Sequence, residues 1–456
     1  MTFRDRMKTL TNHWARCIVS SAILIYSPDL IGAEDPPPQT TEQVAPQQWA
    51  IHGQLTYVEQ NTDGFSAPYS GPNSLSPGRG NETVDATLYA GVQLWPGSEV
   101  WINPEIDQGF GLDNTLGVAA FPSGEAYKVG KNQPYFRLQR LFLRETIDLG
   151  GDREAVAPDL NQLGGYRSAN RWVFTVGKFS VVDIFDANQY AHDPRNDFLN
   201  WGAIDTGSFD YAADAWGYTV GAAAEWYHGA WTLRTGLFDL SNVPNSEHLE
   251  PGLHELQFDL ELERRHEILG HPGKVILTAF DSRGRMGLLA EAVQVAQASG
   301  NAVDIAAVRQ LRDRVGIAFN FEQELSRDLG IFARAGKSAG NVEAYEFTEI
   351  DRTVAVGLSL KGSRWARADD TIGIAGIVND ISAAREQYLN AGGLGIIIGD
   401  GQLPHPGPEQ IVETYYSLGI LPQLHVSLDY QFVKNPAYNR DRGPVSIVGV
   451  RIHAQL

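Results

Sequence analysis

The last eleven residues of the chain, 446–456, constrain its fold more than any other segment. Its side chains alternate between an apolar set, Val448, Val450, Ile452, Ala454 and Leu456, and a small or polar set, Gly449, Arg451, His453 and Gln455. Ile447 alone departs from this alternation. Successive side chains of a strand point to opposite faces of a sheet, so the segment is predicted to be a strand with one apolar and one polar face. A final strand of this kind is typical of a β-barrel with lipid outside and a polar interior.

The amino-terminal segment has the pattern of a secretory signal peptide. A basic stretch precedes a short apolar run at 17–26, and Ile31-Gly32-Ala33 provides small residues for cleavage before Glu34. The apolar run is too short to span a bilayer as a helix, which takes about 20 residues. We therefore predict a signal peptide over residues 1–33.

The rest of the sequence is predicted to have two parts. Residues 34–48 are rich in proline and glutamine and are expected to form a flexible periplasmic leader, and residues 49–456 are expected to form the barrel. The only cysteine, Cys17, lies in the predicted signal peptide, which excludes disulfide and thiolate chemistry from the predicted mature chain. The net charge of -19 argues against nucleic acid as a partner.

Sixteen segments show the alternation expected of strands. Their predicted ranges are 49–60, 84–95, 99–107, 135–148, 172–179, 216–226, 230–240, 254–263, 274–281, 314–324, 328–336, 352–361, 371–378, 411–420, 424–433 and 446–456. The connections after the second, sixth, tenth and fourteenth segments are short, whereas most of those after odd-numbered segments are long. The connection at 149–171 breaks this rule and leaves room for a missed element.

These patterns together predict an all-β fold. We expect a 16-stranded antiparallel transmembrane β-barrel in the outer membrane of a Gram-negative cell, with long extracellular loops and short periplasmic turns. Sixteen strands leave an aqueous channel, whereas about eight would be filled by side chains. Residues 286–313 are rich in Ala, Leu and Gln, and they are expected to form a small helical hairpin at the pore mouth.

Two stretches of the sequence carry a resemblance to a known family. They are residues 176–200, which begin Val176-Gly-Lys-Phe-Ser, and residues 435–456, which begin Asn435-Pro-Ala-Tyr. Together they resemble the carbohydrate-selective porin (OprB-type) family of Gram-negative outer membranes. The resemblance implies a sixteen-stranded barrel that admits glucose and other neutral sugars or polyols by facilitated diffusion. The chain departs from the family pattern at Leu456, where outer-membrane barrels generally have Phe.

The third long loop, 180–215, is rich in groups that can bind hydroxyls. Carboxylates and guanidinium groups form strong hydrogen bonds to hydroxyls, and an aromatic ring can cover the apolar face of a sugar. The candidate residues are Asp186, Asn188, Tyr190, Asp193 and Arg195. The sequence leaves open whether this loop folds into the lumen as a constriction. The alternative is that its Asp and Asn residues only shape turns.

The barrel wall beside this loop provides a second set of candidates. One face of 135–149 carries Arg140, Phe142 and Arg144, and the preceding strand carries Trp101, Glu105 and Asp107 on its inward face. An Arg facing lipid at the bilayer midplane costs about 2 to 4 kcal/mol, so the charged faces are predicted to point inward. Cations opposite carboxylates would let a neutral sugar exchange its hydration for contacts with the wall. The alternative is that these are ordinary wetted lumen residues.

The sequence predicts a channel and not an enzyme. No metal or cofactor site is predicted. The next histidine after His266-Glu267 is His271, which is one residue too far for the zinc-binding motif H-E-x-x-H on a helix. No nucleophile elbow G-x-S-x-G occurs. The expected partners are neutral sugars as permeating solutes, outer-membrane lipid, and the barrel-assembly machinery that would recognise the C-terminal strand. The alternatives are a general diffusion porin, a barrel-embedded hydrolase, and an adhesive barrel with a plugged lumen.

Overall fold

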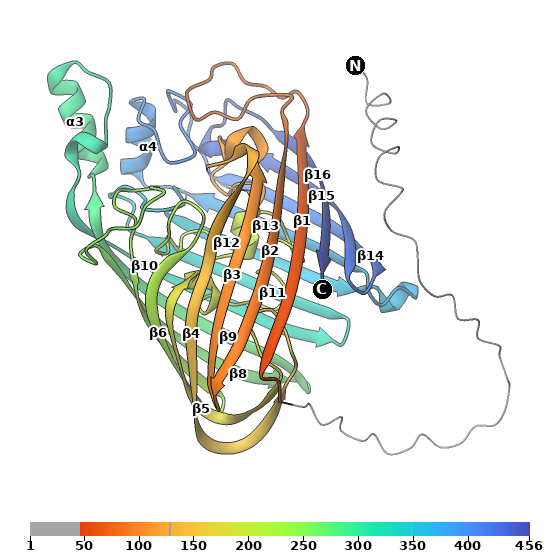
Figure 1. The fold of residues 1–456 in the computed structure, drawn as a ribbon. Helices are drawn as coiled ribbons and strands as arrows, with labels where there is room; N and C mark the ends of the chain where they lie inside the picture. Colours follow the sequence, from red (N-terminus) through yellow and green to blue (C-terminus); the bar gives the residue numbers. More distant parts are fainter. Residues whose placement is uncertain (1–45, 127–128, 348) are drawn as a thin grey trace. The chain divides into compact units, whose positions relative to one another are not determined.

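Sixteen strands form one closed antiparallel barrel in the computed structural model, which describes residues 46–456 apart from 127, 128 and 348 (Figure 1). The strands are β1 (Trp49–Thr62), β2 (Gly80–Trp95), β3 (Ser98–Gly109), β4 (Lys131–Val156), β5 (Gly165–Phe179), β6 (Thr219–His228), β7 (Trp231–Asp239), β8 (Leu256–Ile268), β9 (His271–Met286), β10 (Gln310–Ser326), β11 (Leu329–Ser338), β12 (Arg352–Lys361), β13 (Thr371–Asp380), β14 (Glu409–Leu421), β15 (Leu424–Lys434) and β16 (Val445–Gln455). Each strand pairs with its neighbours in sequence, and β1 closes the barrel against β16. The predicted all-β class and the predicted sixteen strands are confirmed. The predicted signal peptide and residues 34–45 of the predicted leader lie outside the described residues.

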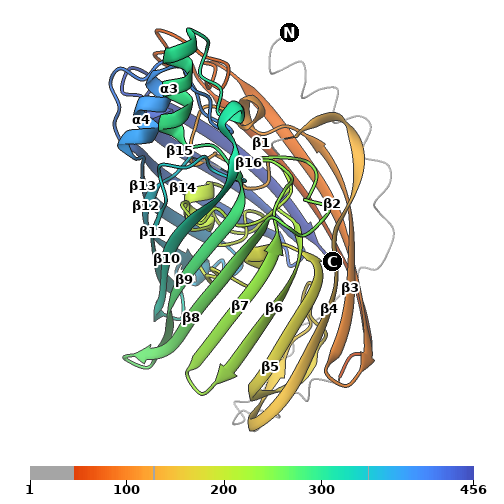
Figure 2. The same ribbon diagram turned by 90° about the vertical axis from the view of Figure 1, so that its left-hand side faces the viewer.

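The two rims of the barrel differ in the length of their connections (Figure 2). Five connections on one rim contain two residues each, for example Leu269–Gly270 between β8 and β9. The other rim carries the long loops, of which the longest joins β5 to β6 through residues 180–218. This asymmetry is the predicted outer-membrane pattern, with the short turns periplasmic and the long loops extracellular.

The last strand has the two faces that the sequence predicts. Val448 and Ile452 point outward and are 54% and 41% exposed, whereas Arg451 and His453 point inward and are buried. Ile447, which breaks the alternation, is buried on the inward face. Outward apolar residues recur on other strands, so the barrel presents an apolar belt to lipid, while its polar strand residues face the interior.

Most predicted strand ends differ from the observed ones by a few residues, and two of the differences bear on the site. The connection at 149–171 hides no missed element, because β4 continues to Val156 and β5 begins at Gly165. The sixth strand begins at Thr219 and not at residue 216, so Trp216 and Tyr218 belong to the preceding loop. In both places, the alternation of apolar and polar side chains does not mark where the strand begins or ends.

The helices are short and lie in the connections. They are η1 (Leu112–Thr115), η2 (Val181–Asp183), α2 (Trp201–Ile204), α3 (Leu289–Ser299), η3 (Ala306–Val308), η4 (Gly362–Trp365), α4 (Ala383–Asn390) and η5 (Pro436–Tyr438). The predicted helical hairpin at 286–313 is only half present: its first part forms α3, its second part forms just the single turn η3, and α3 packs against α4. Among the described residues, no helix is long and apolar enough to cross a membrane.

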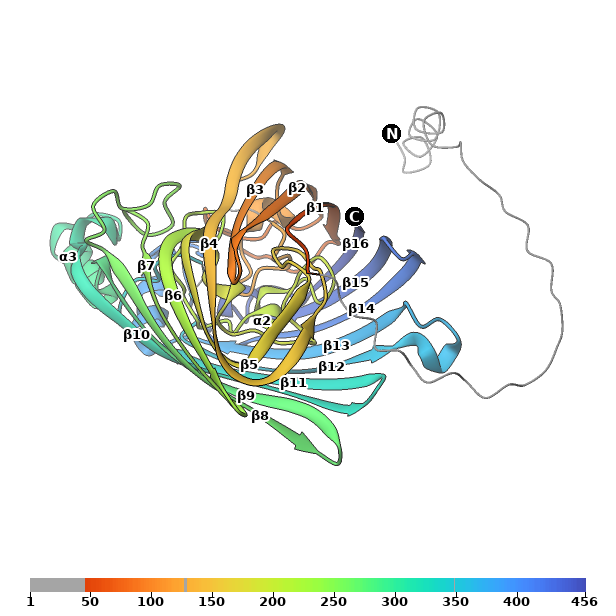
Figure 3. The same ribbon diagram turned by 60° about the horizontal axis from the view of Figure 1, so that its bottom comes forward.

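Part of the barrel interior is filled by an aromatic core. Phe121, Trp201 and Phe347 come from three different long loops, and the Trp201 ring centroid lies 4.9 Å from each of the other two. All three are at most 5% exposed. Helix α2 lies inside the ring of strands and contacts β12 and β13 (Figure 3). These loops occupy the interior beside strands β8–β16, which we call the filled half. We call the interior beside strands β1–β6 the open half.

Candidate functional site

The loop between β5 and β6, residues 180–218, folds into the barrel, which is one of the two arrangements that the sequence leaves open. We call it the inward loop. Arg334 of β11 donates from Nη1 to the carbonyl oxygens of Ala191 and Ala203, at 2.6 and 2.5 Å. The Glu413 carboxylate of β14 accepts from the backbone N–H groups of Leu199 and Asn200, at 2.5 and 3.2 Å. The inward loop is therefore bound to the wall of the filled half.

These contacts have a common physical reason. Backbone N–H and C=O groups that leave water must find partners, because an unpaired buried polar group costs free energy. Arg451 of β16 meets this need for the carbonyl oxygens of Pro194, Asn196 and Asp197, at 2.6 to 3.1 Å. Glu409 of β14 meets it for the N–H groups of Ala119 and Ala120 in the loop between β3 and β4. Inward charges on the filled half thus hold loop backbone.

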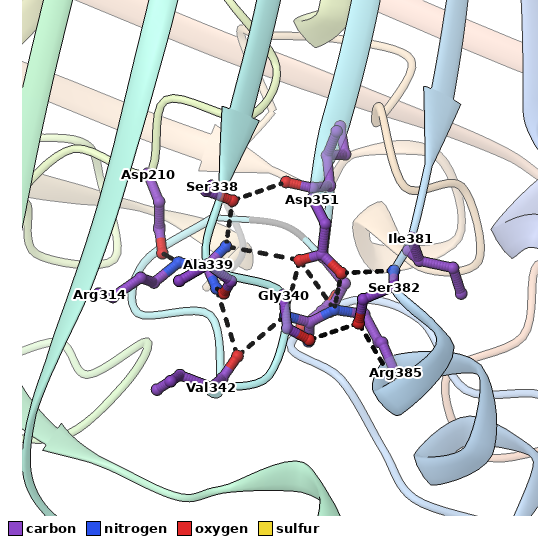
Figure 4. Close-up of polar contacts among 12 residues, drawn as sticks. Asp210, Arg314, Ser338, Ala339, Gly340, Val342, Asp351, Ile381, Ser382 and Arg385 are labelled. Atoms are coloured by element: carbon purple, nitrogen blue, oxygen red, sulfur yellow. Dashed lines mark hydrogen bonds and ion pairs between the residues drawn. The ribbon is translucent and has the colours of Figure 1, made fainter.

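A buried charge network fixes the long loops near the extracellular rim (Figure 4). Asp351 lies between two arginines, and its Oδ1 is 3.0 Å from Arg385 Nη2 and 3.8 Å from Arg314 Nη2. Arg314 also lies 3.1 Å from Asp210 of the inward loop. Ser382, the N-cap of α4, donates from its backbone N–H to Asp351. The network joins the inward loop, β10 and α4 into one unit.

The open half contains a polar cavity of about 540 Å³, which we call the central cavity. Its wall includes Gln54 of β1, Tyr89 of β2, and Arg140, Phe142 and Arg144 of β4. The inward loop forms the opposite side. Charged groups and aromatic rings therefore meet around one space.

Arg140 and Asp183 form a bidentate ion pair on the edge of this cavity. Arg140 Nε and Nη2 lie 2.7 and 2.6 Å from the two Asp183 carboxylate oxygens. Burial alone would raise the pKa of Asp183, but the Arg140 guanidinium outweighs it and lowers that pKa below its usual range. The guanidinium also lies 4.9 Å from the Tyr218 ring centroid. Burial raises the pKa of Tyr218 well above its usual range, so its hydroxyl stays protonated and can donate a hydrogen bond.

Arg195 forms a second charged group across the cavity. Its Nη2 lies 3.1 Å from Glu125, 3.6 Å from Asp85 and 3.9 Å from Glu105. Burial raises the pKa of Glu125 well above its usual range, although Arg195 opposes the shift. Burial would also raise the pKa of Asp193, but Arg195 lowers it. Arg195 therefore faces several carboxyl groups on this side of the cavity.

His192 and Asp205 connect two parts of the inward loop at the cavity. His192 Nδ1 lies 3.6 Å from Asp205 Oδ1, and Nε2 is 3.1 Å from the Val182 carbonyl oxygen. Burial would lower the pKa of His192, but Asp205 raises it above 6.5. Burial raises the pKa of Asp205, and His192 opposes this shift. The pair is a pH-dependent link within the loop.

The predicted site residues separate into two groups. Five line the central cavity: Arg140, Phe142, Arg144, Asp193 and Arg195. The other six do not: Trp101, Glu105, Asp107, Asp186, Asn188 and Tyr190. The alternation of side chains predicts the correct face for the strand residues. It does not predict which of the inward side chains are covered by other groups.

Trp101, Glu105 and Asp107 of β3 point into the barrel but are buried beneath neighbouring groups. A Cβ atom on Gly91 would lie 2.5 Å from the Trp101 ring, so glycine is what lets this ring pack flat against β2. Glu105 accepts hydrogen bonds from Thr87 and Gln139, at 2.5 and 3.0 Å. Asp107 is also fully buried. These groups support the wall and do not face the cavity.

Of the three other predicted residues of the inward loop, two fix its position and one lines another recess. Asp186 lies 3.5 Å from Arg334 and accepts from the Thr206 N–H at 2.6 Å. Asn188 donates to the Asn320 side chain at 2.7 Å. Tyr190 lines a different recess of about 360 Å³ on the far side of the loop. Asp186 and Asn188 are therefore anchors of the loop. The composition of the loop does not distinguish such anchors from residues that line the cavity.

The sequence reading missed several cavity residues. Trp216 was assigned to a strand, but it lies in the inward loop, and Arg137 stacks 3.5 Å above its ring. Tyr89 is on the inward face of a correctly predicted strand, so its alternation was an available signal. Glu125 and the 159–162 turn had no such signal, because long-range folding alone brings them here. In the part of the chain that the structure describes, no group of three or more His, Cys, Asp or Glu side chains is arranged to hold a metal ion.

Comparisons with known proteins agree with this fold. A profile described as "Carbohydrate-selective porin, OprB family" matches residues 73–456. No curated protein matches the sequence. Among solved structures, the chain is similar to OprB of Pseudomonas putida at high pH, with 15% identity and a TM-score of 0.68 over 90% of this chain and 94% of that one. The low-pH form of that protein (12% identity, TM-score 0.47, 90% and 93% covered) and the channel DcaP of Acinetobacter baumannii (10%, 0.46, 91% and 99%) also match. At these identities the structural likeness concerns the fold.

Proposed function

Because the chain belongs to the OprB family of carbohydrate-selective porins and forms an outer-membrane β-barrel, we propose that it carries glucose and related sugars or polyols by passive facilitated diffusion. The observation that supports this most is the central cavity, where the Arg140 and Asp183 pair lies beside the Tyr218 ring. Guanidinium and carboxylate groups bind hydroxyls, and an aromatic face suits the apolar side of a sugar ring.

The charge arrangement favours neutral solutes over ions. Arg140 is paired with Asp183, and Arg195 lies 3.1 to 3.9 Å from the carboxyl groups of Glu125, Asp85 and Glu105, so cationic and acidic groups stand within a few ångströms of each other. A neutral polar solute can exchange its water for these groups, whereas an ion of either sign meets a like charge as well as an opposite one. The cavity volume of about 540 Å³ falls in the range of small-molecule sites.

Transport by this mechanism needs no cofactor or covalent chemistry from the protein. The two remaining alternatives are a general diffusion porin and, with less support, a barrel-embedded hydrolase. The paired charges around one restricted cavity favour a selective pore over a general one. For assembly, we propose that the barrel-assembly machinery recognises the two-faced strand β16.

Liposome swelling tests the proposal. Proteoliposomes with the refolded protein would be diluted into glucose, other sugars, amino acids, or uncharged non-sugars of matched size. We expect faster and saturable uptake of sugars. Uptake ordered by size alone would mean a general pore, and no uptake of any solute would mean a closed barrel and would revive the plugged or hydrolytic alternatives.

A further inference from the structure

The hairpin between β4 and β5 is unlike the two-residue periplasmic turns. β4 runs for 26 residues, and its connection to β5 spans 157–164. We call these residues the periplasmic turn. Figure 3 shows the hairpin curving beneath the ring of strands instead of continuing straight from the wall. Its length and direction bring the turn to the mouth of the open half.

The periplasmic turn has a defined internal structure. Asp159 and Gln162 exchange two backbone hydrogen bonds, each of 3.1 Å. The Gln162 side chain donates to the Ala157 carbonyl oxygen at 2.8 Å, and Asn161 adopts the left-handed backbone region with φ of 55°. Asparagine tolerates this conformation better than most residues. The turn therefore has a fixed shape of its own.

Contacts at both ends hold the periplasmic turn in the mouth of the barrel. Arg144 Nη1 of β4 donates to the Asn161 carbonyl oxygen at 2.7 Å. Gln47, just before β1, donates its backbone N–H to the Gly164 carbonyl oxygen, and its side-chain oxygen accepts from the Gly164 N–H, both at 2.9 Å. Leu163 is 6% exposed and packs into the hydrophobic core. One end is thus tied to the pore wall and the other to the segment that enters β1.

The turn lies between two cavities. Residues 159–162 line the central cavity. The other side of the turn lines a second cavity of about 560 Å³, which residues of β4, β5 and β6 form together with residues of 46–47 and 93–99. Arg144 and Gln162 line both cavities, so the two spaces adjoin at these side chains. A solute moving between the two cavities would pass them.

We propose that the periplasmic turn is a second selectivity element of the pore, in series with the inward loop. Gln162 and the Arg144–Asn161 contact narrow the exit, and they present amide and guanidinium groups to the hydroxyls of a leaving solute. The identity of that solute as a neutral sugar rests on the proposed function. The narrowing itself does not, because it restricts any solute or ion on this path.

A cysteine block tests the narrowing. Cys17 is the only cysteine of the sequence and lies in the predicted signal peptide, so a protein produced without residues 1–33 has no native thiol. Gln162→Cys would be labelled with a bulky, neutral methanethiosulfonate, with complete labelling checked by mass spectrometry. We expect its ion conductance in planar bilayers to fall below about half of the unlabelled value, because the label occupies a restricted part of the pore. The control is Leu269→Cys in the turn between β8 and β9, where the side chain is 95% exposed and lines neither cavity.

The two outcomes decide the proposal independently of the permeating sugar. Loss of conductance in labelled Gln162→Cys but not in labelled Leu269→Cys supports it, whichever solutes the wild type admits. Unchanged conductance in fully labelled Gln162→Cys overturns it. Failure of the sugar proposal would appear elsewhere, as unselective swelling with the wild type. As a second variant, replacing residues 158–163 by Asn-Gly should raise conductance and weaken sugar saturation, and an unchanged conductance would also count against the turn.

Discussion

In the filled half of the barrel, Arg334 and Arg451 donate to loop carbonyl oxygens, whereas in the open half Arg140 and Arg144 face the central cavity. All four lie on barrel strands and point inward. The difference lies in what else stands opposite them: in the filled half the arginines are enclosed by the folded loops, whereas in the open half Arg140, paired with Asp183, and Arg144, bonded to the Asn161 carbonyl oxygen, also border a cavity. An inward charge on a barrel strand is therefore a structural group or a solute-binding group according to the loop that it meets, and four experiments test this distinction.

The largest effect is expected from Arg334→Ala in the filled half. The change leaves the buried Asp186 carboxylate without its cation and two loop carbonyl oxygens without their donor. Breaking a buried ion pair typically costs about 3 to 5 kcal/mol, so we expect the free energy of unfolding to fall by that amount. Urea unfolding in lipid vesicles, followed by tryptophan fluorescence, would measure it. The control is Arg352→Ala, whose pair with Asp380 is exposed and should contribute less than about 1 kcal/mol. Equal losses would contradict the assignment.

A smaller loss is expected from Arg451→Met, also in the filled half. Its guanidinium binds the carbonyl oxygens of residues 194, 196 and 197, next to Arg195 at the cavity. Removing these bonds should cost about 1 to 3 kcal/mol and loosen the edge of the inward loop. Single-channel recordings should then show more open-state current noise. If the variant shows no extra current noise and unfolds at the same free energy as the wild type, the other anchors are enough to hold the edge of the inward loop.

In the open half, Arg140→Ala and Arg144→Ala should change transport more than stability. The Arg140 pair with Asp183 borders the cavity, with 11% and 27% of the two side chains exposed, so its loss should lower the free energy of unfolding by less than the loss of the fully buried Arg334 pair. The half-saturation concentration for sugar uptake should shift in both variants, because the solute loses a hydroxyl-binding group. Sugar-dependent swelling and urea unfolding of the same preparations would separate the two effects. Unchanged uptake in both variants would remove these arginines from the solute path.

The smallest effect is expected where the two halves meet, at His192. Its folded-state pKa lies above 6.5, so the protonated form stabilises the loop fully below about 6.5, and this stabilisation is lost as pH rises through the folded pKa. The free energy difference between wild type and His192→Gln should therefore be about 0.5 kcal/mol near pH 6 and vanish at alkaline pH. Unfolding curves across this pH range would show it. A difference that grows with pH would reverse the sign of the argument.

The sequence predicts the strands better than the site. Alternation depends on neighbouring residues only, which is why segments such as 352–361 coincide with the observed strand β12. The inward faces of β3 and β4 were also correct, because lipid excludes charges such as Arg140. Family resemblance supplied the solute class, which no single residue pattern provides.

The roles of inward residues could not be read from the sequence, because they depend on contacts between distant segments. Asp186 and Asp193 lie in the same loop and have the same side chain, yet Asp186 is an anchor beside Arg334 and Asp193 lines the cavity. Trp101 was correctly placed on an inward face, but Gly91 lets the neighbouring strand cover it. The periplasmic turn was visible only as a connection of unusual length.

The aromatic core around Trp201 also has an evolutionary consequence. Because loops fill much of the lumen, barrel circumference no longer sets the size of the solute that can pass. A change of a few loop or turn residues beside β1–β6 can alter what the pore admits, while the strands and the lipid-facing belt remain the same. Selectivity and membrane assembly can thus evolve on separate sets of residues. One barrel can therefore change the solutes that it admits while the residues that direct its folding stay the same.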